Sequence, residues 1–135
     1  MAQEIQTFVN SIGAVEIDSE LRKFFIRENY FTFPETENLL IIKISRIAKP
    51  FFGVDKRVIE YADKNIEVFY LILLSSEKTG WVYSKEDIKK ALKNNRWSYS
   101  SNDYNYKIGT NAIDDRYWFN SIPEFYQRLK EKEGK

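Results

Sequence analysis

Five basic side chains fall between residues 43 and 57, and such a cluster could hold an anion. They are Lys43, Arg46, Lys49, Lys56 and Arg57, and Asp55 is the only acidic residue among them. We expect a strand to end and a helix to begin in this window, and the free N–H groups at a helix start favour negative charge. The window therefore predicts a phosphate or carboxylate site. Solubility and capping are the alternative, since the window contains no glycine-rich phosphate loop.

A second candidate is an aromatic segment interleaved with cations. It contains Trp97, Tyr99, Tyr104 and Tyr106, together with Arg96 and Lys107, and it follows Lys89, Lys90 and Lys93. Flat rings stack on bases while cations meet phosphates, which is typical of single-stranded nucleic-acid binding. Tyrosine-rich and serine-rich surfaces also suit protein recognition. The alternative is structural, because aromatic residues often cover the edge of a sheet or fill the core.

The third candidate is a set of carboxylates that could serve a metal-dependent nuclease. The set comprises Glu35, Glu37, Asp55, Glu60, Glu67, Asp114 and Asp115. Such an enzyme needs two or three carboxylates near a lysine to hold magnesium and stabilise the developing phosphate charge. An acidic residue two positions before a strand lysine would support this function. That position holds Ile41 before Lys43 and Asn105 before Lys107. The pair at 114 and 115 is either a metal-ligand pair or a turn and capping pair.

The chain contains no histidine and no cysteine. This excludes a serine–histidine triad, thiolate chemistry, disulfide bonds and the usual zinc ligands. No Gly-x-Ser-x-Gly or Ser-x-x-Lys signature occurs either. The sequence therefore indicates no cofactor and no metal, and it favours a domain without catalytic activity.

Charge is distributed unevenly along the chain, although the net charge is only +1. Residues 1–37 carry three basic and seven acidic side chains, residues 38–110 carry thirteen and eight, and residues 111–135 carry five of each. The middle of the chain thus has an excess of five positive charges. This pattern favours a basic face for an anionic partner, with scattered solvated lysines as the alternative.

Hydrophobic spacing and capping residues predict the elements that position these candidates. Apolar residues at helical spacing predict a helix over 2–12 that stops at Gly13, and a second helix over about 18–29. The runs 39–45 and 67–74 are apolar enough for buried strands, the first of them central in a sheet. A turn-like break at 50–53 separates the first of these strands from a helix capped by Asp55.

The second half of the chain continues the alternation. A short strand over 81–83 pairs with 67–74 as a hairpin, and Gly80 eases its turn. Capping boxes start helices at Ser84 and at Ser121, the latter helix running to about residue 131, and a strand is expected at about 105–108. The predicted order is α-α-β-α-β-β-α-β-α. This order indicates a single α+β or α/β domain over 1–135, with a small mixed sheet of about four strands packed by helices.

Three functional hypotheses remain at this point. The first is a non-catalytic domain of a microbial or phage cytoplasm that binds nucleic acid through Lys43, Arg46, Lys49, Lys56, Arg57, Arg96, Trp97, Tyr104, Tyr106 and Lys107. The second is a protein-binding regulator, such as an inhibitor or immunity-type protein, and the third is a divergent metal-dependent nuclease. We expect no membrane segment, since no apolar run reaches the roughly 20 residues that span a bilayer. The oligomeric state stays open.

Overall fold

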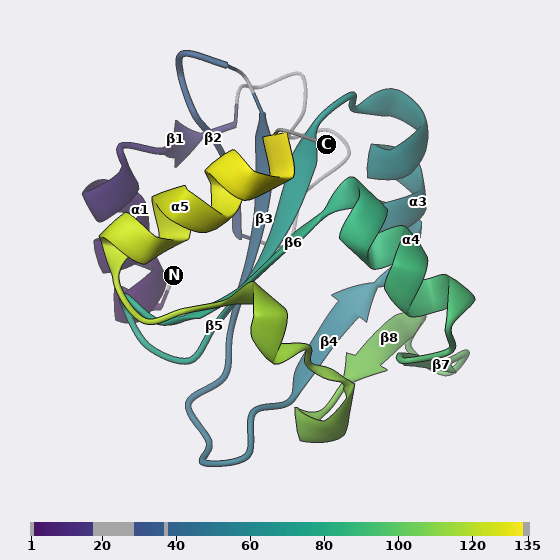
Figure 1. The fold of residues 1–135 in the computed structure, drawn as a ribbon. Coiled ribbons are helices and arrows are strands. Elements are labelled where there is room, and N and C mark those ends of the chain that lie inside the picture. The colour runs from purple at the N-terminus through teal and green to yellow at the C-terminus, as the bar shows by residue number, and fades with distance from the viewer. Residues whose placement is uncertain (1, 18–28, 37, 134–135) are drawn as a thin grey trace.

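A computed structural model of the protein describes residues 2–17, 29–36 and 38–133 (Figure 1). Its helices are α1 (Gln3–Ile12), α3 (Lys56–Asn65), α4 (Lys85–Lys93) and α5 (Ile122–Glu133), with short 3₁₀ turns at Thr110–Ala112 and Asp115–Tyr117. Its strands are β1 (Val15–Glu16), β2 (Asn29–Thr32), β3 (Leu39–Ile44), β4 (Phe52–Asp55), β5 (Phe69–Leu74), β6 (Gly80–Ser84), β7 (Ser98–Ser100), β8 (Asn105–Ile108) and β9 (Trp118–Phe119). The α+β class predicted from the sequence is confirmed.

A mixed sheet of six strands lies at the centre, in the order β1-β2-β3-β5-β6-β9. Among the described strands of this sheet, only β3 and β5 run parallel, and the remaining neighbours are antiparallel. Parallel neighbours need a crossover connection, which β4 and α3 provide here. Both inner strands are buried on both faces, as their continuous apolar runs predict.

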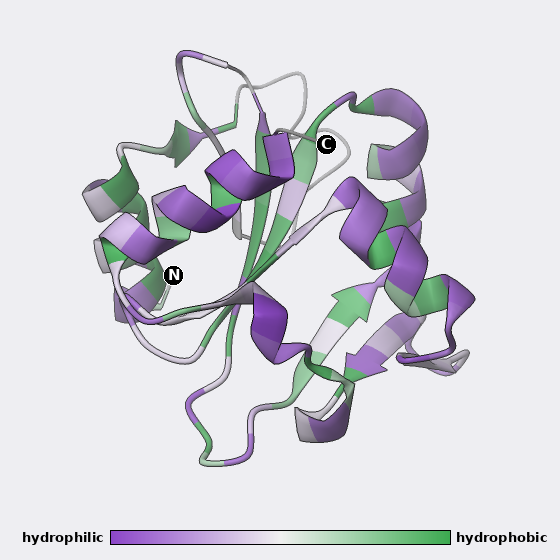
Figure 2. Cartoon of the chain, viewed as in Figure 1, coloured by the Kyte–Doolittle hydropathy of each residue, from purple (hydrophilic) through white to green (hydrophobic). Residues whose placement is uncertain are grey.

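Each face of this sheet has its own hydrophobic core. Helices α1 and α5 cover one face, where Phe8, Phe119 and Phe125 pack with Leu40 and Ile72. Helices α3 and α4 and a second sheet cover the other face (Figure 1). In Figure 2 the central strands are coloured as hydrophobic, whereas the helices show mixed colours, as amphipathic surface helices should. The aromatic-rich segment belongs to this second layer.

The second sheet has three antiparallel strands in the order β4-β8-β7. Alternation along the strands sends Phe52, Val54, Tyr106 and Ile108 into the core beneath. The intervening side chains face outward and are small or polar. This sheet positions most of the candidate residues discussed below.

Local signals in the sequence agree well with the observed helix ends. Gly13 stops α1 in the left-handed conformation with φ of 69°. Asp55 caps α3 by accepting a hydrogen bond from the backbone N–H of Arg57. Ser84 and Asp87 form the reciprocal capping box of α4. These expectations held because capping depends on residues three or fewer positions apart.

Other expectations about the elements were wrong. The expected sheet of about four strands is two sheets, with nine strands among the described residues. The turn-like break expected over 50–53 is shorter than predicted, because Phe52 is already the first residue of β4 and pairs with Ile108. The helix expected over 18–29 lies outside the described residues except for Asn29, which begins β2. Short strands such as β4 and β7 depend on distant partners, so local patterns hide them.

Gly80 has a different role from the one expected. The turn before it is held by hydroxyl groups, with the Oγ atom of Ser75 2.8 Å from the Oγ1 atom of Thr79. Gly80 itself lies within β6, opposite Leu74 and Phe119. A Cβ atom there would overlap the carbonyl oxygen of Leu73 and lie 2.9 Å from the Cα atom of Leu74. Glycine is therefore required for close strand approach.

We expect Gly80→Ala to lower the free energy of unfolding by about 1–3 kcal/mol, because backbone atoms must move to admit the methyl group. Urea denaturation followed by circular dichroism measures this loss. Gly109→Ala is the control, since its nearest neighbour would be Phe51 at 3.8 Å, an ordinary contact distance. Equal stability of the two variants would contradict the close approach of β5 and β6.

Within the described part of the chain, no helix is both long and apolar enough to cross a membrane.

Candidate nucleic-acid interface

A groove of about 610 Å³ lies beside the second sheet. Its lining includes Lys49, Phe51, Arg96, Ser98, Lys107 and Thr110. The three cations come from three separate segments: the β3–β4 loop, the residues after α4, and β8. We call this hollow the basic groove. The structure thus brings together three of the residues that the sequence singled out.

The outer face of the second sheet extends this groove along β8. Gly53, Lys107 and Ser98 form one row across the three strands, and Asp55, Asn105 and Ser100 form the next. These rows lie on the side opposite the buried set. They are roughly 7 Å apart along the strands, since each residue rises about 3.3 Å. The result is a shallow polar face that is open to a partner.

The end of the second sheet away from the groove carries two cation–aromatic pairs. The Nζ atom of Lys56 lies 4.7 Å from the ring centre of Tyr99, and the guanidinium carbon of Arg57 lies 4.5 Å from that of Tyr104. The two tyrosines expose 42% and 48% of their surface. Arg57 pairs with Asp55 on the outer face, whereas Tyr99 lies opposite Tyr106 in the register and therefore emerges at the edge of the sheet from its other side. We call the two cation–aromatic pairs the tyrosine edge.

Acidic partners hold several of these cations in place. The hydrogen bond from Arg57 lowers the pKa of Asp55, and that from Lys107 lowers the pKa of Asp103. Both carboxylates are therefore charged at neutral pH. Together the groove and the edge carry five cations, namely Lys49, Lys56, Arg57, Arg96 and Lys107, against the three acidic partners Asp55, Glu60 and Asp103. The surface keeps an excess of positive charge, which attracts an anionic partner.

The structure corrects the expected roles of Trp97 and Tyr106. Both rings are buried, with 6% and 9% of their surface exposed, and their centres lie 6.0 Å apart in the core. A buried ring cannot stack on a base. Trp97 also packs against Tyr83, with ring centres 5.5 Å apart. The alternative that aromatic residues fill the core applies to these two, because alternation along β8 and the end of α4 point them inward.

Two predicted cations lie apart from both the basic groove and the tyrosine edge. Arg46 forms a two-pronged ion pair with Glu4 of α1, including a 2.8 Å hydrogen bond, and this bond lowers the pKa of Glu4 to about 2. Lys43 lies on β3 in register with Leu73 and does not line the groove. Neither residue belongs to the basic face. The sequence window grouped them with Lys49 because it could not show that Arg46 pairs with Glu4, forty-two positions earlier in the chain.

The carboxylates considered for a nuclease are dispersed or already paired. Asp55 pairs with Arg57, Glu60 with Lys56, and Asp114 with Arg116. Glu37 lies outside the described residues. Among residues 2–17, 29–36 and 38–133, no three acidic side chains are grouped so that they could hold a metal ion. Asp114 accepts from the backbone N–H of Arg116, which is the capping role named as an alternative.

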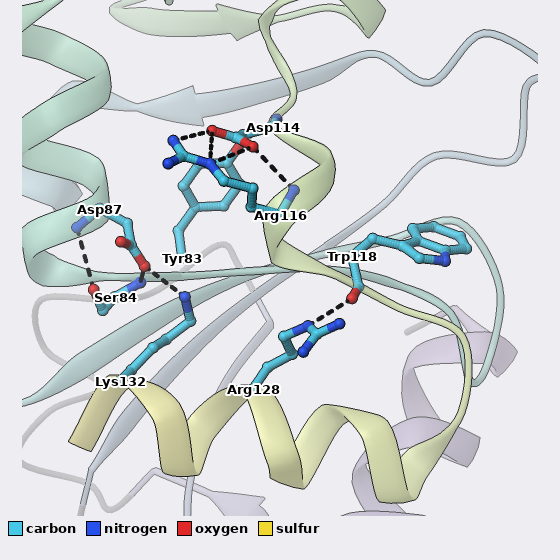
Figure 3. A network of polar contacts seen from close by, with 8 residues as sticks. All are labelled: Tyr83, Ser84, Asp87, Asp114, Arg116, Trp118, Arg128 and Lys132. Atoms are coloured by element: carbon cyan, nitrogen blue, oxygen red, sulfur yellow. Dashed lines mark hydrogen bonds and ion pairs between the residues drawn. The ribbon is translucent and has the colours of Figure 1, made fainter. Parts of the chain in front are cut away.

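Sequence reasoning missed a polar network beside α4 (Figure 3). Lys132 of α5 donates to the Oδ2 atom of Asp87 at 2.6 Å, and both side chains are nearly buried. Asp87 also accepts from the backbone N–H of Ser84. Burial alone would raise the pKa of Asp87, but the hydrogen bonds from Lys132 and Ser84 lower it overall. The network joins the last helix to the start of α4.

The same network borders a second hollow of about 350 Å³, which we call the tyrosine pocket. Its lining includes Tyr83, Asp87, Lys90, Arg96, Asp114 and Tyr117. The backbone N–H of Asp114 donates to the Tyr83 hydroxyl at 3.2 Å. In this region the sequence indicated only the capping box at Ser84, because the pocket is formed where β6, α4 and the two 3₁₀ turns meet. No local motif marks such a junction.

Comparison of the chain with protein-family models, with curated proteins and with solved structures found no match in any of the three.

Proposed function

We propose that this protein is a non-catalytic domain that binds single-stranded nucleic acid along the basic groove and the outer face of the second sheet. The observation that carries the proposal is the convergence of Lys49, Arg96 and Lys107 around one groove beside Phe51. Phe51 exposes half of its surface, which leaves its ring free for a base. Cations along a groove suit phosphates that recur along a strand.

The tyrosine edge supports the same function. Tyr99 and Tyr104 lie under cations that can turn toward phosphates, while their exposed rings suit base stacking. Stacking favours single strands, since bases in a duplex already stack on each other. We place the activity in the cytoplasm as part of this proposal, because a chain without cysteine suits a reducing compartment.

We expect a triple variant to bind a short single-stranded oligonucleotide roughly tenfold or more weakly at low salt. The variant combines Lys49→Ala, Arg96→Ala and Lys107→Ala. Fluorescence polarisation across a salt series measures the affinity and its salt dependence. Three lost phosphate contacts should reduce the slope of log K against log salt by about 2. A duplex of the same sequence is expected to bind more weakly.

The matched control removes three exposed lysines elsewhere, at Lys64, Lys78 and Lys130. It makes the same change in net charge and should retain most of the affinity. If the control loses as much affinity as the groove variant, binding depends on net charge and the groove is not the site. Undetectable or salt-insensitive binding by the native chain overturns the proposed function.

A protein-binding regulator is the second candidate, and one observation favours it. The β3–β4 loop exposes two large apolar side chains, with Ile47 exposed by 61% beside Phe51. Apolar side chains on an exposed loop suit a protein partner better than a phosphate backbone. A single stoichiometric partner in a pull-down that is lost with Ile47→Ser but kept with Lys107→Ala would support this candidate over the first.

A further inference from the structure

The tyrosine pocket lies next to the basic groove, and the two hollows share part of their walls. Arg96 and Ala112 line both of them. Arg96 also donates to the carbonyl oxygen of Asn111, which holds its side chain across the boundary. A strand in the groove therefore has a direct continuation past Arg96. The volume of about 350 Å³ lies within the range of small-ligand sites.

Both carboxylates in the pocket wall already have positive partners. Asp87 is paired with Lys132, and Asp114 is paired with Arg116. Lys90 and Arg96 also line the pocket, and neither forms an ion pair with any described residue. The pocket and its ion pairs thus contain four cations, Lys90, Arg96, Arg116 and Lys132, against the two carboxylates of Asp87 and Asp114. Its net field favours a ligand with negative charge.

Hydrogen-bond donors also outnumber free acceptors in the pocket. Burial raises the pKa of Tyr83 to about 12, so its hydroxyl keeps a proton at neutral pH. That hydroxyl oxygen already accepts from the N–H of Asp114, which leaves the O–H available as a donor. Lys90 and Arg96 add charged donors at the rim. An oxyanion with several acceptor oxygens matches this arrangement better than a neutral group does.

The tyrosine rings themselves have little free surface. Tyr83 is buried, and Tyr117 has the Nζ atom of Lys132 4.2 Å from its ring centre and the Arg116 guanidinium 5.7 Å from it. Tyr117 also packs against the ring of Tyr83 at 4.8 Å and is less exposed than Tyr99 and Tyr104, so it offers a base little ring surface. The pocket differs in this respect from the groove, where Phe51 is exposed. The ligand group it suits is a phosphate.

We propose that the tyrosine pocket holds the terminal phosphomonoester of the strand that lies in the basic groove. This inference rests on the proposed function. A terminal phosphate carries a charge of about −1.5 to −2 at neutral pH, and an internal phosphodiester carries only −1. Lys90, Arg96 and the Tyr83 hydroxyl can therefore select the end of a strand over its interior. The selection weakens as pH falls through about 6, where the phosphomonoester gains a proton.

The test compares three oligonucleotides of one sequence, with a 5′-phosphate, with a 3′-phosphate and with neither. We expect one phosphorylated form to bind the native chain about fivefold to tenfold more tightly than the unphosphorylated form at pH 7.5. Lys90→Ala should remove that preference and leave binding of the unphosphorylated form within about twofold. Lys93→Ala, on the same helix but outside the pocket lining, should keep the preference.

Tyr83→Phe is a second variant, since it removes the donor and retains the ring. It should reduce the preference about threefold. Equal binding of all three oligonucleotides by the native chain overturns this inference and leaves the proposed function standing. A further experiment tests whether the pocket binds phosphate without a strand. Inorganic phosphate and a mononucleotide are titrated into the protein, and NMR follows the amide resonances near Ala91. Shifts with these probes but no oligonucleotide binding overturn the proposed function, and the pocket remains a phosphate site independent of a strand.

Discussion

Trp97→Ala is expected to lower the free energy of unfolding by about 3–5 kcal/mol, which is the usual cost of truncating a buried tryptophan. The ring is 6% exposed and packs between Tyr83 and Tyr106, so its removal leaves a cavity that the neighbouring rings cannot close. The melting temperature should fall by roughly 10–15 °C. Nucleic-acid affinity, measured on the fraction that remains folded, should change little because the ring does not reach the surface.

Tyr104→Ala is the matched variant in the same segment, and it should behave in the opposite way. Its ring is 48% exposed, so we expect a stability change below about 1 kcal/mol. Loss of a stacking platform should weaken oligonucleotide binding by roughly fivefold or more. Thermal melting and polarisation on both variants check the pair. A stable Trp97→Ala variant that binds poorly would contradict the division between core rings and surface rings.

Trp97→Phe separates packing from hydrogen bonding at this position. The indole N–H of Trp97 is buried without a hydrogen-bond partner in the described part of the chain. Replacement by phenylalanine therefore loses ring volume but no hydrogen bond, and it removes a buried unpaired donor. We expect its cost to be less than half that of the alanine variant.

Asp87→Ala is expected to cost about 3 kcal/mol, the second large effect. The substitution leaves Lys132 nearly buried without its carboxylate partner and removes the reciprocal half of the capping box at Ser84. Breaking a buried ion pair on one side costs about 3–5 kcal/mol, and the lysine offsets part of this by turning toward water at the end of α5. Urea denaturation measures the loss. Asp103→Ala is the control, because its ion pair with Lys107 is exposed and should contribute little.

The same interaction makes the protein sensitive to acid. The folded-state pKa of Asp87 lies below its unfolded value of about 3.9, so its contribution to stability is complete above about pH 5. That contribution is lost as the pH falls through the folded-state pKa. The stability difference between the native chain and Asp87→Ala should therefore shrink between pH 5 and pH 2. A difference that stays constant over this range would show that the carboxylate charge is not what stabilises the contact.

In each of the two regions of the candidate site, the sequence predicted some local elements but not which side chains lie together. In the window 43–57, the end of the strand over 39–45 and the cap at Asp55 were predicted, but β4 was missed and the window also grouped Arg46 with Lys49. Arg46 instead pairs with Glu4, forty-two positions earlier in the chain. In the aromatic segment, the strand at 105–108 was predicted, but Trp97 and Tyr104 looked equivalent. Trp97 precedes β7 and packs inward on Tyr83 and Tyr106, whereas Tyr104 lies between β7 and β8 with φ of 60° and stays exposed.

Sequence patterns were enough to predict the end of α1, the caps of α3 and α4, the two long buried strands and the excess of positive charge in the middle of the chain. Each of these follows from composition or from residues a few positions apart, where capping and hydrophobic spacing act. The three-dimensional fold was needed to show which cations share a groove, which rings are buried and that Asp87 pairs with Lys132. Those outcomes depend on pairing between strands far apart in the chain, and the free energy of that pairing comes from packing that no short segment contains.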